Sequence, residues 1–400
     1  MDRDDQFRFE YEPAVLRFGT GSVEKLTDEL AEHGLERALV VCGSTVGSTP
    51  EVIDPVTDGL GERLVGIFAE TTADKRLETA VSGLKSLRKH DADVLVSLGG
   101  GSSLDVAKVI SVLAADDRNP AEFGRELAET GSISIPSGSL TPIVAVPTTL
   151  AGADQSIVAG VTASPSSGLV DEPTSGGVSD PRLMPRAVVY DPSLFATTPK
   201  PILAASAMNG FNKGIETLYA RNATPVTDAT ALRGLRLLQE GLPQLGERDV
   251  DEAVLEPVVE GILLAQYGVS RPEEITLSII HAFGHGLTRT YDVQQGAAHA
   301  IIAPQVLRYL LDNGAGRREL LAEALGVGDA SDPANAVVES VERVRDALDL
   351  PSRLRDVDGS EPAEFPEVAQ AILNDPFMAN APPGLDPTWE ELVSVLKKSY

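Results

Sequence analysis

The first half of the chain alternates short apolar runs, rich in β-branched residues, with longer amphipathic stretches. Five apolar runs lie at 38–43, 64–69, 93–100, 142–149 and 187–192. In the stretches between them, such as residues 23–34, apolar positions recur every three or four residues, which predicts helices. Continuous apolar runs separated by helices are typical of a parallel sheet covered on both faces. The pattern therefore predicts a doubly wound α/β domain.

The second half of the chain has a different pattern. After about Pro199 the strand signals fade and helical periodicity continues to the end of the sequence. A chain of 400 residues, 42% of them hydrophobic, is long enough for two domains. We expect an α/β domain over residues 1–198 and an all-helical domain over 199–400. The stretch 163–182, rich in Gly, Ser and Pro, is expected to form an irregular loop or a β-ribbon.

Charge narrows the choice of partners. The chain has 60 acidic and 33 basic residues, a net charge of −27, and the acidic residues are scattered along it. Such a surface disfavours nucleic acid as a partner and predicts a protein adapted to a salt-rich cytoplasm, where salt screens the self-repulsion. The sequence has no apolar segment long enough to predict a membrane span. Its charged start lacks the apolar region of a secretory signal. The single cysteine, Cys42, is interpreted as a small apolar filler near a strand end.

A candidate phosphate site follows the third apolar run. There a buried strand leads into Gly99, Gly100, Gly101 and Ser102, and an amphipathic helix begins. Glycine lets the backbone approach an anion, and the first amides of a helix point at it. Tight strand-to-helix turns also use glycine for steric reasons alone. The position at the carboxyl end of a parallel strand favours the phosphate interpretation.

Neighbouring polar residues add to this site. Asp105 and Lys108, in the first turns of the predicted helix, are candidates for holding the loop or reaching a cofactor. Thr148 and Thr149 end the next predicted strand, where their hydroxyls either bind the cofactor or cap a turn. The glycines match neither the GxGxxG nor the GxxxxGK[ST] pattern, which disfavours a kinase or NTPase.

Three motifs, taken in this order and spacing, resemble the iron-dependent alcohol dehydrogenase superfamily. They are SLGGGSSLDVAK at 97–108, VPTTLAG at 146–152 and the segment from His281 to Tyr309. Within that superfamily, residues 179–194 and 206–238 look most like the maleylacetate reductase branch, whose members reduce the carbon–carbon double bond of maleylacetate with NAD(P)H. The resemblance implies a dehydroquinate synthase-like fold, in which a nucleotide-binding α/β domain and an all-α domain flank the active site.

The same resemblance implies an NAD(P)H site. It places the glycine turn and Asp105 around the pyrophosphate and nicotinamide, and the two threonines against the cofactor. Many NAD-preferring relatives carry an aspartate after the first strand, where this chain has Gly43. Without that carboxylate a 2′-phosphate is not repelled, so NADPH is permitted and NAD stays open.

The resemblance also locates the metal ligands of the relatives, an aspartate and three histidines. These positions hold Asn209, Lys213, His281 and Gln295 here. A protonated lysine repels a divalent cation, and Asn and Gln are weak ligands, so we predict that no catalytic metal is bound. The maleylacetate reductase branch usually keeps the histidines, so its chemistry is not carried over unchanged.

The spacing suggests what replaces the metal. Asn209 and Lys213 lie one helical turn apart, as do His281 and His285. Lys213 would place an ammonium where the metal sat and polarise a carbonyl, while His281 and His285 are the natural proton donors. His299 matches a histidine of the maleylacetate reductase branch. Each of these residues is also compatible with a packed or solvated side chain. Arg289 could pair with a substrate carboxylate, but an exposed helix arginine is the favoured interpretation.

Three functions stay open at this point. The first is a metal-independent NAD(P)H reductase of a small oxo acid, aldehyde or ketone, with maleylacetate-like substrates favoured. The second is an alcohol or polyol dehydrogenase of the same superfamily, and the third a degenerate homologue that binds a nucleotide without catalysis. By analogy with relatives, a homodimer or larger homo-oligomer is expected, with a small-molecule substrate as the other partner.

Overall fold

The computed structural model describes residues 7–247, 250–358 and 360–400, so residues 1–6 at the charged start of the chain lie outside it. The chain forms two compact units, and each is described by itself. The α/β unit consists of Tyr11–Thr149 and Ala153–Thr198. The helical unit consists of Pro199–Tyr400, the segment that ends at Glu10, and the short piece Leu150–Gly152. The division at Thr198 falls where the sequence pattern changes, but these two added pieces were not expected from it.

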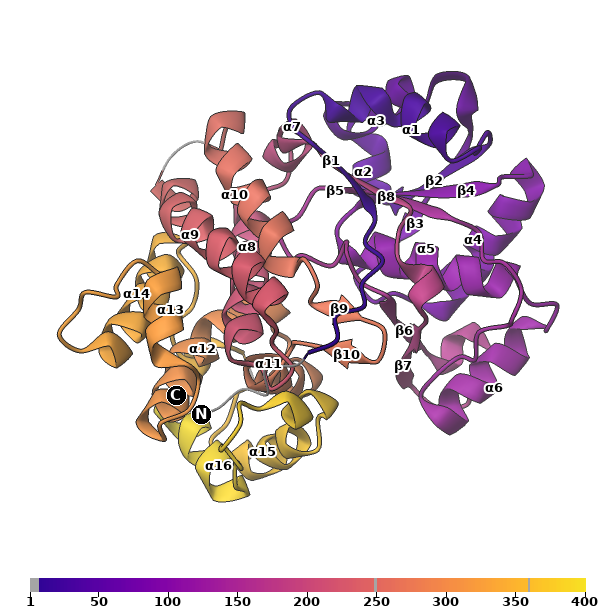
Figure 1. The fold of residues 1–400 in the computed structure, drawn as a ribbon. Coiled ribbons are helices and arrows are strands. Elements are labelled where there is room, and N and C mark those ends of the chain that lie inside the picture. The colour runs from indigo at the N-terminus through magenta and orange to yellow at the C-terminus, as the bar shows by residue number, and fades with distance from the viewer. Residues whose placement is uncertain (1–6, 248–249, 359) are drawn as a thin grey trace. The chain divides into compact units, whose positions relative to one another are not determined.

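A six-stranded parallel sheet forms the centre of the α/β unit (Figure 1), in the order β1-β8-β5-β4-β2-β3. All five apolar runs form strands of this sheet. The sixth strand, β1, was not predicted. It lies at the edge of the sheet, where its residues are only partly buried, and its sequence VLRF is not a continuous apolar run. The strands are β1 (Val15–Phe18), β2 (Ala38–Gly43), β3 (Leu64–Thr71), β4 (Val94–Gly99), β5 (Ile143–Pro147) and β8 (Ala187–Tyr190).

Helices cover both faces of the sheet. On one face, alternate strand residues such as Val40, Val96 and Val144 form a buried core with Leu26 and Val56, which come from α1 (Leu26–Glu32) and α3 (Pro50–Leu60). On the other face pack α4 (Leu77–His90) and α5 (Gly101–Ala114). Burial of both faces explains why the strands appear as unbroken apolar runs in the sequence. The remaining helices of this unit are α2 (Ser44–Ser48), α6 (Pro120–Thr130) and α7 (Pro192–Ala196), with short 3-10 turns between elements.

The strand order creates a switch point between β2 and β4. The chain leaves β2 toward β3 on one side and leaves β4 toward β5 on the other, although β2 and β4 are neighbours. In open α/β sheets, ligands bind beyond the carboxyl ends of the strands at such a point. Here these ends carry Gly43 and Gly99.

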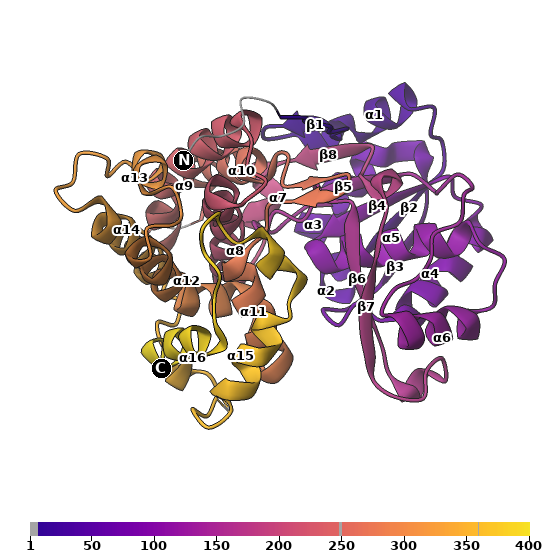
Figure 2. The same cartoon turned by 60° about the horizontal axis from the view of Figure 1, so that its bottom comes forward.

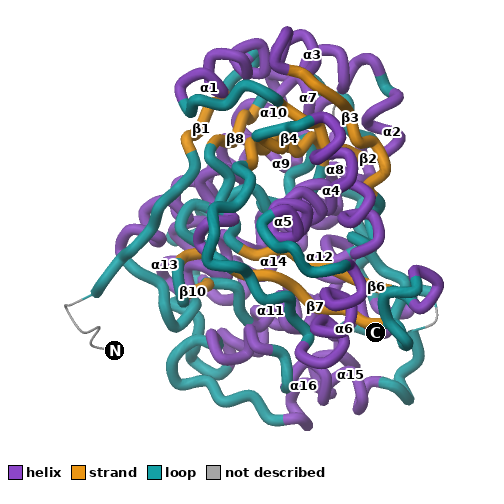
Figure 3. The backbone as a smooth tube through the Cα atoms, turned by 90° about the vertical axis from the view of Figure 1, so that its right-hand side faces the viewer, coloured by secondary structure: helices purple, strands orange, loops and turns teal. Residues whose placement is uncertain are grey.

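A two-stranded ribbon occupies part of the Gly-, Ser- and Pro-rich region. Strand β6 (Val158–Ala163) pairs antiparallel with β7 (Thr174–Ser179), apart from the six sheet strands in Figure 3. For the region 163–182 a loop or a ribbon was expected, and the ribbon is confirmed for its second strand, while residues 164–173 form the connection between the two strands. The first strand begins five residues earlier than the region that the sequence delimited.

The helical unit is built around α8 (Lys200–Tyr219), α11 (Ile279–Thr290) and α12 (Gln295–Asp312), which contact one another (Figure 2). Its small antiparallel pair, β9 (Ser270–Arg271) and β10 (Glu274–Ile275), is the exception to an all-helical pattern. In the described part of the chain, no helix is long and apolar enough to span a bilayer. The other helices are α9 (Pro225–Glu247), α10 (Glu252–Gln266), α13 (Arg318–Ala324), α14 (Pro333–Ala347), α15 (Phe365–Leu373) and α16 (Trp389–Lys398).

Candidate active site

The glycine turn lies between β4 and α5, as the sequence predicted. Gly99 has φ of +128°, a conformation that side-chain-bearing residues rarely adopt. Gly100 is the N-cap of α5 and, because it has no side chain, makes no side-chain cap hydrogen bond to the first amides. Gly101 and Ser102 form the first turn and are partly exposed. The helix therefore offers uncapped amides and the positive end of its dipole to an anion.

Close packing fixes this turn. A Cβ added to Gly100 would lie 3.2 Å from Cγ2 of Thr149, and one added to Gly99 would lie 3.2 Å from Oγ of Ser103. The Thr148 amide donates to the Gly99 carbonyl over 3.1 Å, which joins the ends of β4 and β5. Both predicted threonines thus lie beside the glycine turn in the same unit.

Two charged residues of α5 have protein partners. The buried carboxylate of Asp105 pairs with Lys75 at 2.5 Å. The buried ammonium of Lys108 donates to the carbonyls of Ser156 at 2.5 Å and Val158 at 3.0 Å. Lys108 therefore holds the start of the β6 ribbon and not the glycine turn, while its contact with a cofactor stays a prediction. Gly43 ends β2 with an ordinary extended backbone.

In the helical unit, α8 places Asn209, Lys213 and Glu216 on one stripe, at spacings of four and three residues. Asn209 is half-buried, whereas Lys213 and Glu216 are buried. The Lys213 ammonium donates to the Gly152 carbonyl at 2.5 Å. That segment comes close to α8 because Gly210 has no side chain: a Cβ there would lie 2.3 Å from the Leu150 carbonyl oxygen.

His281, near the start of α11, is held on both ring nitrogens. Its Nδ1 is hydrogen-bonded to the buried carboxylate of Glu216, and Nε2 lies 3.1 Å from Oδ1 of Asn209. The second carboxylate oxygen of Glu216 accepts the His281 backbone amide over 3.0 Å. Glu216 thus links α8 to the N-terminus of α11, where a helix favours negative charge.

Burial dominates the electrostatics here. It raises the pKa of Glu216 to about 8, although amides at the start of α11 oppose the shift. It lowers the pKa of His281 well below its ordinary value, and the positive charge of Lys213 acts in the same direction. His281 is therefore neutral at pH 7, because its charged form would be buried beside a cation.

The second predicted histidine of α11, His285, has its own carboxylate. Its Nδ1 lies 2.9 Å from Oδ2 of Asp375, a residue that precedes the 3-10 turn η6 (Pro376–Asn380). Arg289 is exposed and lies 3.5 Å from the same oxygen. Arg289 therefore agrees with the interpretation as an exposed helix arginine.

His299 lies in the interior between α11 and α12. It is fully buried, and neither ring nitrogen has a hydrogen-bond partner among the described residues. Its ring meets that of His281 edge-on, with centroids 4.4 Å apart. Burial, followed by the neighbouring His281 and His285, lowers the pKa of His299 well below its ordinary value. Contact with His281 brings it into the cluster, while its burial favours a packing role over contact with substrate.

Comparison with known proteins agrees with this division into two parts. The family profile described as "Iron-containing alcohol dehydrogenase" matches residues 13–192, and "Fe-containing alcohol dehydrogenase family, C-terminal" matches residues 203–400. The chain belongs to the iron-containing alcohol dehydrogenase family. It is accordingly an oxidoreductase, and the predicted superfamily and fold class are confirmed.

Similar members of the family have different substrates by name. Lactaldehyde reductase of Escherichia coli K12 is 27% identical over 394 residues, which is 96% of this chain and 97% of that protein. Maleylacetate reductase 1 of Cupriavidus pinatubonensis is 25% identical over 375 residues, which is 93% of this chain and 92% of that protein. A solved putative alcohol dehydrogenase from Ralstonia eutropha is 26% identical with a TM-score of 0.80, over 99% of this chain and 98% of that one.

The side chains of this unit do not fit the divalent ion for which the family is named. At the positions that the resemblance assigns to ligands, two are amides and one is an ammonium that would repel the ion. The remaining one, His281, has Nε2 directed at an amide oxygen. Gln295, the first residue of α12, is half-buried. Among the described residues no three His, Cys, Asp or Glu side chains are grouped so as to hold a metal.

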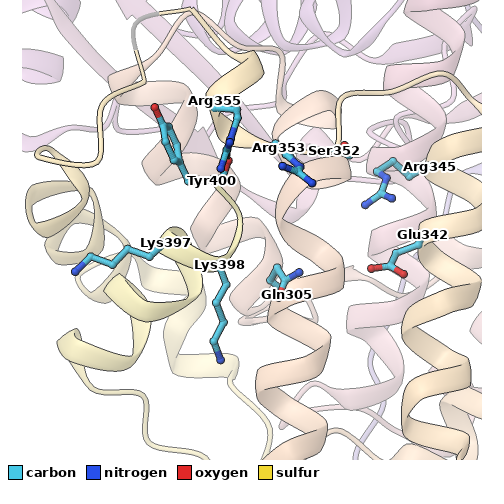
Figure 4. A pocket seen from close by; sticks show the side chains of 9 residues that line it. All are labelled: Gln305, Glu342, Arg345, Ser352, Arg353, Arg355, Lys397, Lys398 and Tyr400. Atoms are coloured by element: carbon cyan, nitrogen blue, oxygen red, sulfur yellow. The ribbon is translucent and has the colours of Figure 1, made fainter.

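A hollow elsewhere in the helical unit contains none of the predicted site residues. Its volume is about 430 Å³, and basic side chains line it together with Gln305 near its centre and Glu342 beside Arg345 (Figure 4). Helices α14 and α16 both end there, and cations in a last turn stabilise a helix terminus. The helix ends therefore account for part of the cluster, which consists of Arg345, Arg353, Arg355, Lys397 and Lys398.

Sequence reasoning missed the two carboxylates that hold the histidines. Glu216 continues the stripe of Asn209 and Lys213 by one turn, a signal that was present in the sequence. Asp375 is 90 residues from His285, and no local pattern connects them. Both carboxylates contact imidazoles only because the helices pack together.

Proposed function

We propose that the protein is an NAD(P)H-dependent reductase of a small oxo acid, aldehyde or ketone, and that it acts without a metal. The observation that carries this proposal is the Lys213 ammonium, buried beside Asn209 and His281 at a position where family members carry a metal ligand. An ammonium there supplies the positive charge that a carbonyl oxygen needs when a hydride arrives.

Cofactor binding is assigned to the α/β unit. Gly99, Gly100, Gly101 and Ser102 would hold the pyrophosphate on the uncapped amides of α5, with Thr148 and Thr149 beside them. Gly43 leaves the end of β2 without a carboxylate, so NADPH as well as NADH is accepted. The cofactor, when bound, supplies the hydride.

Lys213 is assigned the electrophilic role. As hydride reaches the carbonyl carbon, the electron pair of the C=O bond moves to oxygen, and Lys213 stabilises this alkoxide. With a conjugated oxo acid, hydride adds to the far alkene carbon and the charge again collects on the carbonyl oxygen, as an enolate. A proton then completes the reduction, on oxygen in the first case and on carbon in the second. His281 and His285 are the candidate donors.

The substrate class follows from relatives and stays a proposal. The likeness to maleylacetate reductases and the Lys213 cation favour an anionic oxo acid that is conjugated with an alkene. A second candidate, reduction of short hydroxyaldehydes, is favoured by the likeness to lactaldehyde reductase over 96% of the chain.

A substrate screen decides between these candidates. Oxidation of NADPH and NADH is followed at fixed protein concentration with maleylacetate, other dicarboxylic oxo acids, lactaldehyde and simple ketones. We expect the highest kcat/KM with a dicarboxylic oxo acid. Turnover of lactaldehyde alone would favour the second candidate, and turnover of none of them would favour a nucleotide-binding protein without catalysis.

A further inference from the structure

Two histidines on one face of α11 are held in the same way by buried carboxylates. His281 Nδ1 bonds to Glu216 from α8, and His285 Nδ1 bonds over 2.9 Å to Asp375, which lies directly before the turn η6. A carboxylate that accepts the Nδ1 proton of a histidine fixes both the tautomer and the ring orientation, so that Nε2 becomes the working nitrogen. Asp375 can act on His285 in this way, whereas Glu216, whose pKa burial raises to about 8, shares a proton with Nδ1 of His281. In both pairs Nε2 is the nitrogen that faces away from the acid, and the two Nε2 atoms lie one helical turn apart.

The surroundings of these two Nε2 atoms differ. That of His281 lies against Oδ1 of Asn209, and the side chain is only 2% exposed. The side chain of His285 is 30% exposed, and its Nε2 has no hydrogen-bond partner among the described residues. Only His285 can take a proton back from solvent after giving one away. His281 instead orients the Asn209 amide.

Asp375 is rigid enough to position a catalytic ring. Its side chain is 1% exposed, and its other oxygen accepts the Phe377 amide over 3.0 Å. The Phe377 ring lies tilted beside the His285 ring, with centroids 5.1 Å apart. The imidazole is therefore fixed along its Nδ1 bond by Asp375 and beside one face by Phe377. An adjacent carboxylate also stabilises the imidazolium that must exist before a proton is given.

From this geometry we infer that His285 is the proton donor of the proposed reduction and that Asp375 is its positioning residue. The inference rests on the proposed function. The imidazolium of His285 gives its Nε2 proton to the alkoxide oxygen or to the enolate carbon, and the product leaves uncharged at that atom. In the neutral imidazole a proton stays on Nδ1, in the hydrogen bond to Asp375. Water then returns a proton to Nε2 at the exposed edge of the ring.

Steady-state kinetics of matched variants test the donor role. We expect His285→Ala to lower kcat by about 10²-fold, with partial recovery on adding imidazole, and we expect no such recovery for His281→Ala. Asp375→Asn should lower kcat by at least about tenfold with little change in KM, and Asp375→Glu should restore part of it. Asp332→Asn is the control, because Asp332 likewise caps a helix through its side chain but precedes α14.

A second readout does not depend on turnover. The chain has only five histidines, so their ¹⁵N ring signals can be resolved in an NMR spectrum. We expect neutral His285 to carry its proton on Nδ1 in the wild type and in Asp332→Asn, and to lose this preference in Asp375→Asn. A wild-type His285 protonated on Nε2 would overturn the positioning by Asp375.

The outcomes separate this inference from the proposed function. Imidazole rescue of His281→Ala but not of His285→Ala, or an unchanged kcat in Asp375→Asn, would overturn the inference in an active reductase. A wild type that reduces no carbonyl substrate would overturn the proposed function and the donor role with it, while the NMR result would still decide whether Asp375 holds His285.

Discussion

The imidazole of His299 lies where a side chain at Gly284 would begin. An added Cβ at Gly284 would be 2.3 Å from Nε2 and 2.6 Å from Cδ2 of His299. Gly284 lies on α11 between His281 and His285, and His299 lies on α12. The glycine therefore sets how closely the helix with the two candidate histidines approaches α12.

This contact makes Gly284→Ala a probe of the cluster. We expect the substitution to lower the free energy of unfolding by about 1–3 kcal/mol, because the methyl group overpacks a filled interior. Urea unfolding followed by circular dichroism measures the change. Gly138→Ala is the matched control, since a Cβ there meets no atom within 4 Å, and it should leave stability within about 0.5 kcal/mol of wild type.

The cause can be verified with a double variant. If the His299 ring is what the new methyl group displaces, the loss caused by Gly284→Ala should shrink in a His299→Ala background. Equal losses in both backgrounds would show that the alanine acts elsewhere on α11.

His299 also predicts a pH dependence of stability. Because burial lowers its pKa in the folded protein, the unfolded chain binds the proton that the native state refuses, and stability falls as pH drops below about 6.5. His299→Leu removes the contribution of His299 to this pH dependence. His281, whose pKa is also lowered, makes a contribution of the same sign, which remains in the wild type and in the variant. Thermal unfolding at a series of pH values from about 8 to 5 should therefore show a shallower acid-side loss in the variant. Parallel curves would mean that the pKa of His299 is the same in the native and the unfolded protein, which would contradict the prediction.

The glycine turn can be tested through binding alone. Gly99→Ala places a side chain at φ +128° and should weaken NADPH binding at least about tenfold, because the loop must move away from the amides of α5. Quenching of protein fluorescence or calorimetry measures the Kd, with Gly138→Ala again as control. An unchanged Kd for Gly99→Ala would remove the turn from the cofactor site.

The hydrophobic pattern of neighbouring residues was enough to predict the central strands and the glycine turn. The five central strands and the turn at Gly99 were visible because strand burial, glycine and helix periodicity are properties of adjacent residues. The edge strand Val15–Phe18 escaped prediction, since it has no unbroken apolar run. The small pair Ser270–Arg271 and Glu274–Ile275 is too short to leave a periodic signal.

The site was predictable only on the residues that carry the motifs. Asn209, Lys213 and His281 are brought into one cluster, as their spacing on two helices suggested. Asp375 could not be found, because it precedes a short 3-10 turn 90 residues along the chain and its contact with His285 arises from packing. The ion pair of Asp105 with Lys75 was hidden for the same reason.

The net charge of −27 predicts a response to salt. At about 1 M salt the Debye length is near 3 Å, so repulsion between surface carboxylates is almost fully screened. We therefore expect the Tm to rise steadily between about 0.1 M and 2 M KCl. Differential scanning fluorimetry measures it, with sucrose as an uncharged cosolute for comparison. A Tm that falls or stays level in KCl would contradict adaptation to a salt-rich interior.

Metal-independent reduction is tested by the rate of NADPH oxidation, measured with protein that has been dialysed against a chelator and assayed with the best carbonyl substrate. We expect a rate that is unchanged by the chelator or by added Fe²⁺ or Zn²⁺. We also expect that Lys213→Ala loses about 10²–10³-fold in kcat, while Lys85→Ala, which removes an exposed lysine, keeps the wild-type rate. A rate that depends on added metal, or a Lys213→Ala variant as fast as the wild type, would contradict this mechanism.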